Sequence, residues 1–242
     1  MNEPETFVIV ILGLAAFVRG AFGFADALVA MPLLLMLLPT TEAASLMSMV
    51  ACLIAVVILC RERQAVEFRS AATLIVFGII GVPMGIWLAG VVDQKIARTI
   101  LGGVVVGFSG WSLLKPEQLH IASDRPAPAF GLAAGILGGA FNTAGPPIVF
   151  FAALRRWPPS RFRATMQAYT LFGSSWVIAM HSIAGNITQA TLTRLAIAAP
   201  LVVVATLFGQ RFTAKLATER FIKWIYRLLI VLGIFLMVSG LM

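Results

Sequence analysis

The stretch Gly20-Ala21-Phe22-Gly23-Phe24-Ala25-Asp26 interrupts a long apolar run that extends from Thr6 to Pro39. A single straight helix over that run would be about 50 Å long, whereas the hydrocarbon core of a membrane is about 30 Å thick. Glycine is a poor helix former, and aspartate prefers the ends of helices. The sequence therefore predicts two short helices that meet inside a membrane, either as a re-entrant hairpin or as two thin crossings.

Composition places the rest of the chain in the membrane class as well. Of the 242 residues, 60% are hydrophobic and only 12% are charged, and the mean hydropathy is +0.97. A soluble domain needs more charge than this to cover its surface. Three further apolar segments, at 43–60, 70–92 and 96–114, are each long enough to cross a bilayer as one helix. We therefore predict an all-α integral membrane protein.

The same pattern recurs in the second half of the chain. Residues 140–150 align without a gap with residues 21–31, and an interrupted run at 127–154 precedes apolar segments at 164–183, 192–212 and 221–242. We predict two transmembrane repeats, 1–114 and 127–242, joined by a cytoplasmic linker at 115–126. Each repeat begins with a broken or re-entrant helix pair followed by three transmembrane helices. An odd number of crossings gives the repeats inverted topology, which is common among secondary transporters.

The net charge of +8 follows the predicted loops rather than a nucleic-acid-binding surface. Basic residues gather at 61–69, 155–163 and 211–223, between apolar segments, as is typical of the cytoplasmic face. With these loops inside the cell, both termini fall outside. No basic stripe with interleaved aromatic residues occurs, so we predict no nucleic-acid partner.

Two ionisable residues flank the first break, and an unpaired charge in hydrocarbon is costly enough to make each a candidate for function. Arg19 could bind an oxyanion through its forked guanidinium donors. It could instead neutralise the end of its helix or pair with Asp26. Asp26 could couple transport to protons, because its protonation would remove competition with an anionic substrate. We favour a simpler role for Asp26, the N-cap of the second short helix.

The second break suggests a site for an anion. Pro146 and Pro147 suit the first turn of a half-helix whose N-terminus would face the middle of the membrane. Because proline has no amide hydrogen, the ligands would come from neighbouring residues. The predicted substrate-binding residues here are Asn142, Thr143, Gly145 and Ile148. A structural helix break, with polar side chains that satisfy freed carbonyl groups, is the alternative.

The helix after the second break carries further polar residues. Gln167 is predicted to bind substrate as Arg19 does, although a hydrogen bond between helices is an alternative for it. Thr170, Ser174 and Ser175 are expected to bond back to the backbone of their own helix.

An enzyme is not predicted. His181 lies about 10 Å along the helix axis from Ser174, too far to act as its base. The chain has no nucleophile-elbow, zinc or phosphate-loop motif. We therefore expect no catalytic activity, no metal site and no cofactor.

The glycine-rich breaks are similar to those of a known family. The stretches Gly20–Phe24 and Gly138–Pro147, with the loop Leu154–Thr165, resemble the sulfite exporter TauE/SafE family of bacterial membrane proteins. The resemblance covers nearly the whole chain. It implies export of sulfite, sulfonates or related small sulfur-containing anions across the bacterial cytoplasmic (inner) membrane. This sequence has Asp26 and residues 142–144 where members often carry further glycines.

We thus predict a multi-pass secondary transporter that works by alternating access, holds a small anion between the two breaks, and has Asp26 as its candidate for proton coupling. A passive anion channel, or a membrane protein without transport activity, is the alternative. The expected partners are the anion and the lipid bilayer. A homodimer is a possible assembly of the chain.

Overall fold

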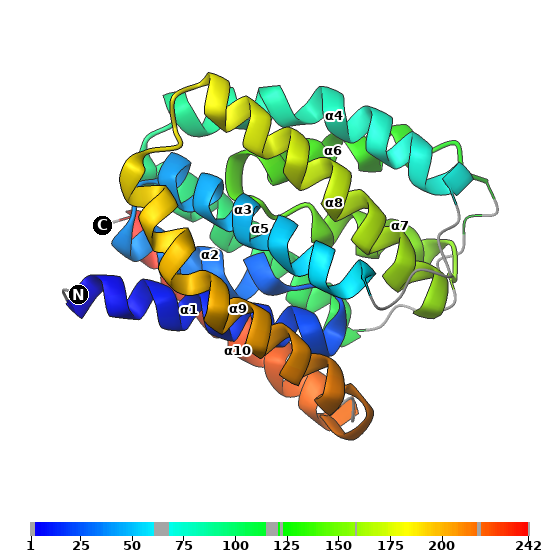
Figure 1. Ribbon diagram of the computed structural model, residues 1–242. Coiled ribbons are helices and arrows are strands. Elements are labelled where there is room, and N and C mark those ends of the chain that lie inside the picture. The colour runs from blue at the N-terminus through cyan, green and yellow to red at the C-terminus, as the bar shows by residue number, and fades with distance from the viewer. Residues whose placement is uncertain are drawn as a thin grey trace.

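The computed structural model describes residues 3–60, 68–114, 121, 123–157, 159–216 and 219–241. These residues form ten α-helices and no strand (Figure 1). Most of the predicted linker, 115–126, and the basic loop at 61–67 lie outside the described residues; Pro126 of that linker is the N-cap of α6. The helices are α1 (Glu3–Phe22), α2 (Asp26–Leu37), α3 (Thr40–Leu59), α4 (Phe68–Val91), α5 (Gln94–Leu114), α6 (Ala127–Phe141), α7 (Gly145–Leu154), α8 (Pro159–Ile183), α9 (Gln189–Leu216) and α10 (Glu219–Leu241).

Both interrupted runs are broken, as predicted, and at aligned positions. The first break separates α1 from α2 at residues 23–25, and the second separates α6 from α7 at residues 142–144. The backbone turns through the left-handed region in each break, with φ of 79° at Gly23 and 51° at Asn142. Glycine adopts this conformation without steric cost, and asparagine tolerates it better than most residues do.

The lengths of the helices suit a membrane. Five described helices are long and apolar enough to cross one, over Glu5–Phe22, Thr40–Leu59, Ala72–Val91, Gln94–Leu114 and Gln189–Phe212. The arms of the breaks are shorter, with 12 residues in α2, 15 in α6 and 10 in α7. At 1.5 Å per residue these arms reach only about 15–22 Å, less than the thickness of the hydrocarbon core.

The outer surface of the bundle is apolar. Large hydrophobic side chains face outward from several helices, among them Trp87 on α4, Val204 on α9 and Val231 on α10, which are 68%, 63% and 63% exposed. A soluble protein rarely exposes apolar area on this scale, whereas lipid tails accept it. The surface therefore matches the predicted bilayer partner.

The α6–α7 pair starts and ends at the same end of the helix bundle. The backbone N–H of Ile121, before α6, donates a 3.0 Å hydrogen bond to the carbonyl of Leu154 at the end of α7. Arg155 forms an ion pair of 3.0 Å with Asp124. The chain therefore leaves α7 at the end of the bundle from which it entered α6.

The α1–α2 pair also returns to its starting end. Helix α1 runs parallel to α9, since Gly13 lies against Leu201 and Gly20 lies against Thr206. Helix α9 begins beside the start of α3, where Arg194 and Glu42 form an ion pair. Because α3 directly follows α2, the start of α1 and the end of α2 lie near each other.

Close helix packing holds the two breaks in place. Helix α1 packs on α9, α4 on α6, α3 on α8 and α5 on α10 (Figure 1). A Cβ atom on Gly20 would lie 2.3 Å from the carbonyl oxygen of Thr206, and one on Gly135 would lie 2.2 Å from that of Gly78. Only glycine permits such approaches, which are typical of membrane helices. Most side chains of α2 are buried in the main hydrophobic core, so the first break lies inside the protein.

Candidate functional site

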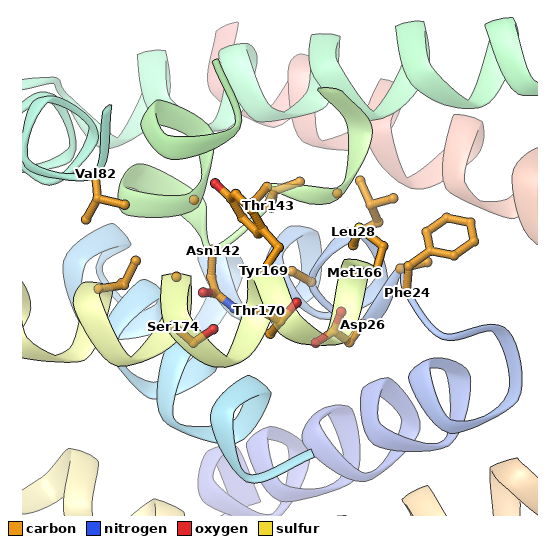
Figure 2. Close-up of a pocket in the computed structure, with 17 residues that line it drawn as sticks. Phe24, Asp26, Leu28, Val82, Asn142, Thr143, Met166, Tyr169, Thr170 and Ser174 are labelled. Atoms are coloured by element: carbon orange, nitrogen blue, oxygen red, sulfur yellow. The ribbon is translucent and has the colours of Figure 1, made fainter. Parts of the chain in front are cut away.

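A cavity lies where the two breaks meet helix α8 (Figure 2). The empty space at this cavity is about 530 Å³, a volume that includes open solvent at its mouth. The first break and the start of α2 supply residues 24–28, and the second break and the start of α7 supply residues 142–145. The remaining lining residues are Val82 of α4, Gly138 of α6, and Met166, Tyr169, Thr170, Gly173, Ser174 and Val177 of α8.

Two helices begin at this cavity. Asp26 is the first residue of α2 and Gly145 is the first residue of α7, and both line the cavity. Neither helix start has a side-chain capping hydrogen bond. The amide groups of an uncapped first turn carry partial positive charge, which favours anions.

Asp26 is bound to Arg19 rather than to the start of its own helix. The Nη1 group of Arg19 donates a 2.8 Å hydrogen bond to Oδ2 of Asp26, and the two side chains are only 4% and 7% exposed. The N-cap residue of α2 is Ala25, so the prediction that Asp26 is the cap is wrong. The reason is that a charge-assisted bond to a guanidinium is stronger than a cap bond to a neutral amide.

Gln167 connects α8 to this ion pair. Its side-chain oxygen accepts a 3.2 Å hydrogen bond from Nη2 of Arg19, and its amide group donates a 3.1 Å bond to the carbonyl of Gly23. The alternative role of Gln167, a hydrogen bond between helices, is thereby confirmed. Together Gln167 and Asp26 hold the guanidinium of Arg19 behind the cavity wall.

The polar side chains of the second break have partners of their own. Asn142 donates a 3.3 Å hydrogen bond to the carbonyl of Met47 in α3, and the Thr143 hydroxyl donates a 2.9 Å bond to the carbonyl of Phe141. An amide group has two hydrogens and a hydroxyl has one. Asn142 therefore keeps one donor for a ligand, whereas Thr143 keeps only acceptor capacity.

The structure gathers four of the seven predicted site residues at the cavity. Those four are Asp26, Asn142, Thr143 and Gly145. Arg19 and Gln167 lie one layer further out. Ile148 is fully buried and packs in a second hydrophobic cluster with Phe151 and Met166.

Three residues that line the cavity were not among the predicted site residues: Tyr169, Thr170 and Ser174. Ser175 bonds back to the carbonyl of Leu171 at 2.7 Å, as expected of a membrane-helix serine. Thr170 and Ser174 instead face the cavity, next to Tyr169. A signal was present, because residues 166, 170, 173 and 177 follow the spacing of one helix face.

Comparison with known proteins agrees with this arrangement. The model of the family described as Sulfite exporter TauE/SafE matches residues 8–237. The chain belongs to the sulfite exporter TauE/SafE family. The match confirms the resemblance seen in the sequence. Since it spans both breaks and α8, every element of the cavity lies in the part that the TauE/SafE family shares.

Two curated relatives extend the comparison. The "Probable sulfite/organosulfonate exporter TauE" of Cupriavidus necator is 25% identical over 236 residues, which cover 95% of this chain and 92% of that protein. The "Probable inner membrane transporter protein TsaS" of Comamonas testosteroni is 26% identical over 152 residues, or 61% of this chain and 63% of that protein. No solved structure matches the chain significantly. Family and helices together make this TauE/SafE member a multi-pass membrane protein.

Proposed function

We propose that this protein is a secondary transporter that exports a small sulfur-containing anion, such as sulfite or a sulfonate, across the bacterial inner membrane. The observation that carries the proposal is the meeting of two uncapped helix N-termini, those of α2 and α7, at one cavity. Paired half-helix N-termini of this kind bind anionic groups in other transporters. The names of the two relatives support the substrate class. The anion crosses chemically unchanged, so the protein is not an enzyme.

Asp26 links this anion site to protons. Among the described residues that line the cavity it is the only charged one, and Arg19 neutralises it from behind. Protonation would leave the positive charge of Arg19 uncompensated, which raises the attraction for an anion. Arg19 also has a buried Nε–H group without a partner among the described residues. Proton binding and anion binding therefore favour each other, and the two ions travel together.

The predicted substrate-binding residues take distinct roles in this proposal. The free amide hydrogen of Asn142 and the backbone N–H of Gly145 donate to the anion. Thr143 fixes the backbone of the second break through its bond to Phe141. Ile148 anchors α7 in the hydrophobic cluster that sets the direction of its N-terminus. Arg19 and Gln167 act through Asp26.

Alternating access requires two parts that can rock against each other. Three features support two inverted repeats, 1–114 and 127–242, joined at 115–126. First, the breaks fall at aligned residues. Second, the helix pairs correspond: α1 packs on α9 as its counterpart α6 packs on α4, while α3 packs on its counterpart α8 and α5 on its counterpart α10. Third, the α6–α7 pair adjoins the start of α8, near Trp157, whereas the α1–α2 pair adjoins its end, near Asn186. Rocking around the shared cavity would expose it to each side in turn.

Flux through proteoliposomes tests the proposal. Vesicles with the purified protein are loaded with methanesulfonate or sulfite, and efflux is followed with and without a pH gradient; protein-free vesicles are the control. We expect saturable efflux that accelerates when the loaded compartment is the more acidic one. Flux that does not saturate and ignores the gradient would indicate a passive channel. Absence of flux for every sulfur oxyanion, with folded protein, would refute the proposal.

A further inference from the structure

Three hydroxyl groups of α8 face the cavity without a protein partner. Tyr169, Thr170 and Ser174 line it and are only 4%, 8% and 5% exposed (Figure 2). Within the described part of the chain, none of these hydroxyls makes a hydrogen bond. The three oxygens are not among the buried polar atoms that lack a partner, so each is accessible from the cavity. Three accessible hydroxyl donors around one cavity suit a ligand that accepts their hydrogen bonds.

The helix and its neighbour fix where these hydroxyls lie. Thr170 and Ser174 are four residues apart, about one turn, and Tyr169 adjoins Thr170. The phenol hydroxyl of Tyr169 lies against α4, where a Cβ atom on Gly78 would be only 2.5 Å from it. The glycine thus makes room for the phenol. The three groups approach the cavity from separate positions rather than from one point.

Hydroxyl groups suit an anion that must be both bound and released. Each donates one hydrogen, rotates to meet its acceptor and has no charge of its own. Its bond to an anionic oxygen is short and stronger than a bond between neutral groups. A further cation would hold the anion more tightly, whereas a transported ion has to leave again.

We propose that Tyr169, Thr170 and Ser174 are the donor set that binds the oxygens of the transported anion. The inference rests on the proposed function and extends it to specificity. Three separated donors match an anion with several oxygens, such as a sulfonate or sulfite. A spherical halide meets fewer of them at once. The hydroxyl face of α8 therefore selects oxyanions, while the helix N-termini supply attraction common to all anions.

Three single-hydroxyl variants test this inference: Tyr169→Phe, Thr170→Val and Ser174→Ala. Binding of methanesulfonate and of chloride to the purified protein is measured by calorimetry. Each variant should bind methanesulfonate about tenfold more weakly, the effect of one hydrogen bond to a charged group. Chloride binding should change much less. Ser175→Ala is the matched control, because that hydroxyl already bonds to Leu171 and should leave both affinities unchanged.

The outcomes separate the inference from the proposed function. Wild-type protein that binds methanesulfonate but does not transport it refutes the function and still allows the variants to be compared. Variants that behave like Ser175→Ala overturn the inference, even when wild-type flux is normal. An equal loss for methanesulfonate and chloride would also overturn it, since that result indicates a structural role. Tyr169→Phe keeps the aromatic ring and its packing. Its affinity for methanesulfonate therefore tests the inference even if one of the other variants is unstable.

Discussion

Arg19 and Asp26 join the two arms of the first break, because the guanidinium on α1 donates a 2.8 Å hydrogen bond to the carboxylate that opens α2. Both side chains are almost completely buried. Either charge is costly there without a counter-ion, because the desolvation of a single buried ion is not repaid by neutral neighbours. The pair therefore fixes the orientation of α1 relative to α2 and holds the carboxylate of Asp26 at the cavity.

The variant Arg19→Gln should destabilise the protein by about 3–5 kcal/mol, because it leaves the carboxylate of Asp26 buried and unpaired. It should also lower anion flux sharply. The double variant Arg19→Gln/Asp26→Asn should regain most of the stability without regaining flux. Chemical unfolding in detergent measures the first effect and proteoliposome flux the second. A single variant with wild-type flux would show that Arg19 is purely structural.

Binding of methanesulfonate should strengthen as the pH falls. The charge of this probe does not change over the range used, so the effect reports on the protein. Protonation of Asp26 releases the positive charge of Arg19, and the anion then binds better. Asp26→Asn should show tight binding that no longer depends on pH, measured by calorimetry at several pH values. A wild-type affinity that stays constant would rule out Asp26 as the coupling residue.

Gly145→Ala should reduce anion binding without harming the fold. A Cβ atom at Gly145 meets nothing within 4 Å, so the methyl group enters the cavity. We expect the free energy of unfolding to stay within about 0.5 kcal/mol of the wild-type value and the KM for flux to rise several-fold. Gly90→Ala is the control, because its Cβ also has open space but lies away from the cavity. Equal KM values for the two variants would argue against a ligand at the start of α7.

The ion pair between Glu42 and Arg194 should stabilise the contact of α3 with α9. Both side chains are about one-fifth exposed, at 22% and 19%. Glu42→Gln should lower the free energy of unfolding by about 1 kcal/mol, as is usual for a pair that water still reaches. The exchanged pair Glu42→Arg/Arg194→Glu should restore most of the loss. If the exchanged pair is less stable than the single variant, the contact depends on more than opposite charges.

The breaks could be predicted from the sequence because their causes are local. Glycine at 20 and 23, the paired prolines at 146 and 147, and an apolar run too long for one helix all act through neighbouring residues. The alignment of the two halves then indicated where the second break should lie. The structure places both breaks at those positions.

The partners across the breaks could not be predicted in the same way. The choice of Asp26 between a cap and Arg19 depends on the angle between α1 and α2, which composition does not determine. Similarly, Thr170 and Ser175 have the same tendency to bond to their own helix. Only the rotation of α8 decides that one faces the cavity and the other does not, and that rotation depends on packing against α3 and α4.

Protection of a cysteine in the cavity would test the central claim most directly. Gly145→Cys is introduced into a protein whose native Cys52 and Cys60 are replaced by alanine, and its reaction with a membrane-impermeant thiol reagent is followed in proteoliposomes. We predict labelling from each side of the membrane, slowed by methanesulfonate at concentrations that saturate flux. If methanesulfonate at concentrations that saturate transport does not slow the labelling, the anion does not bind between the two breaks.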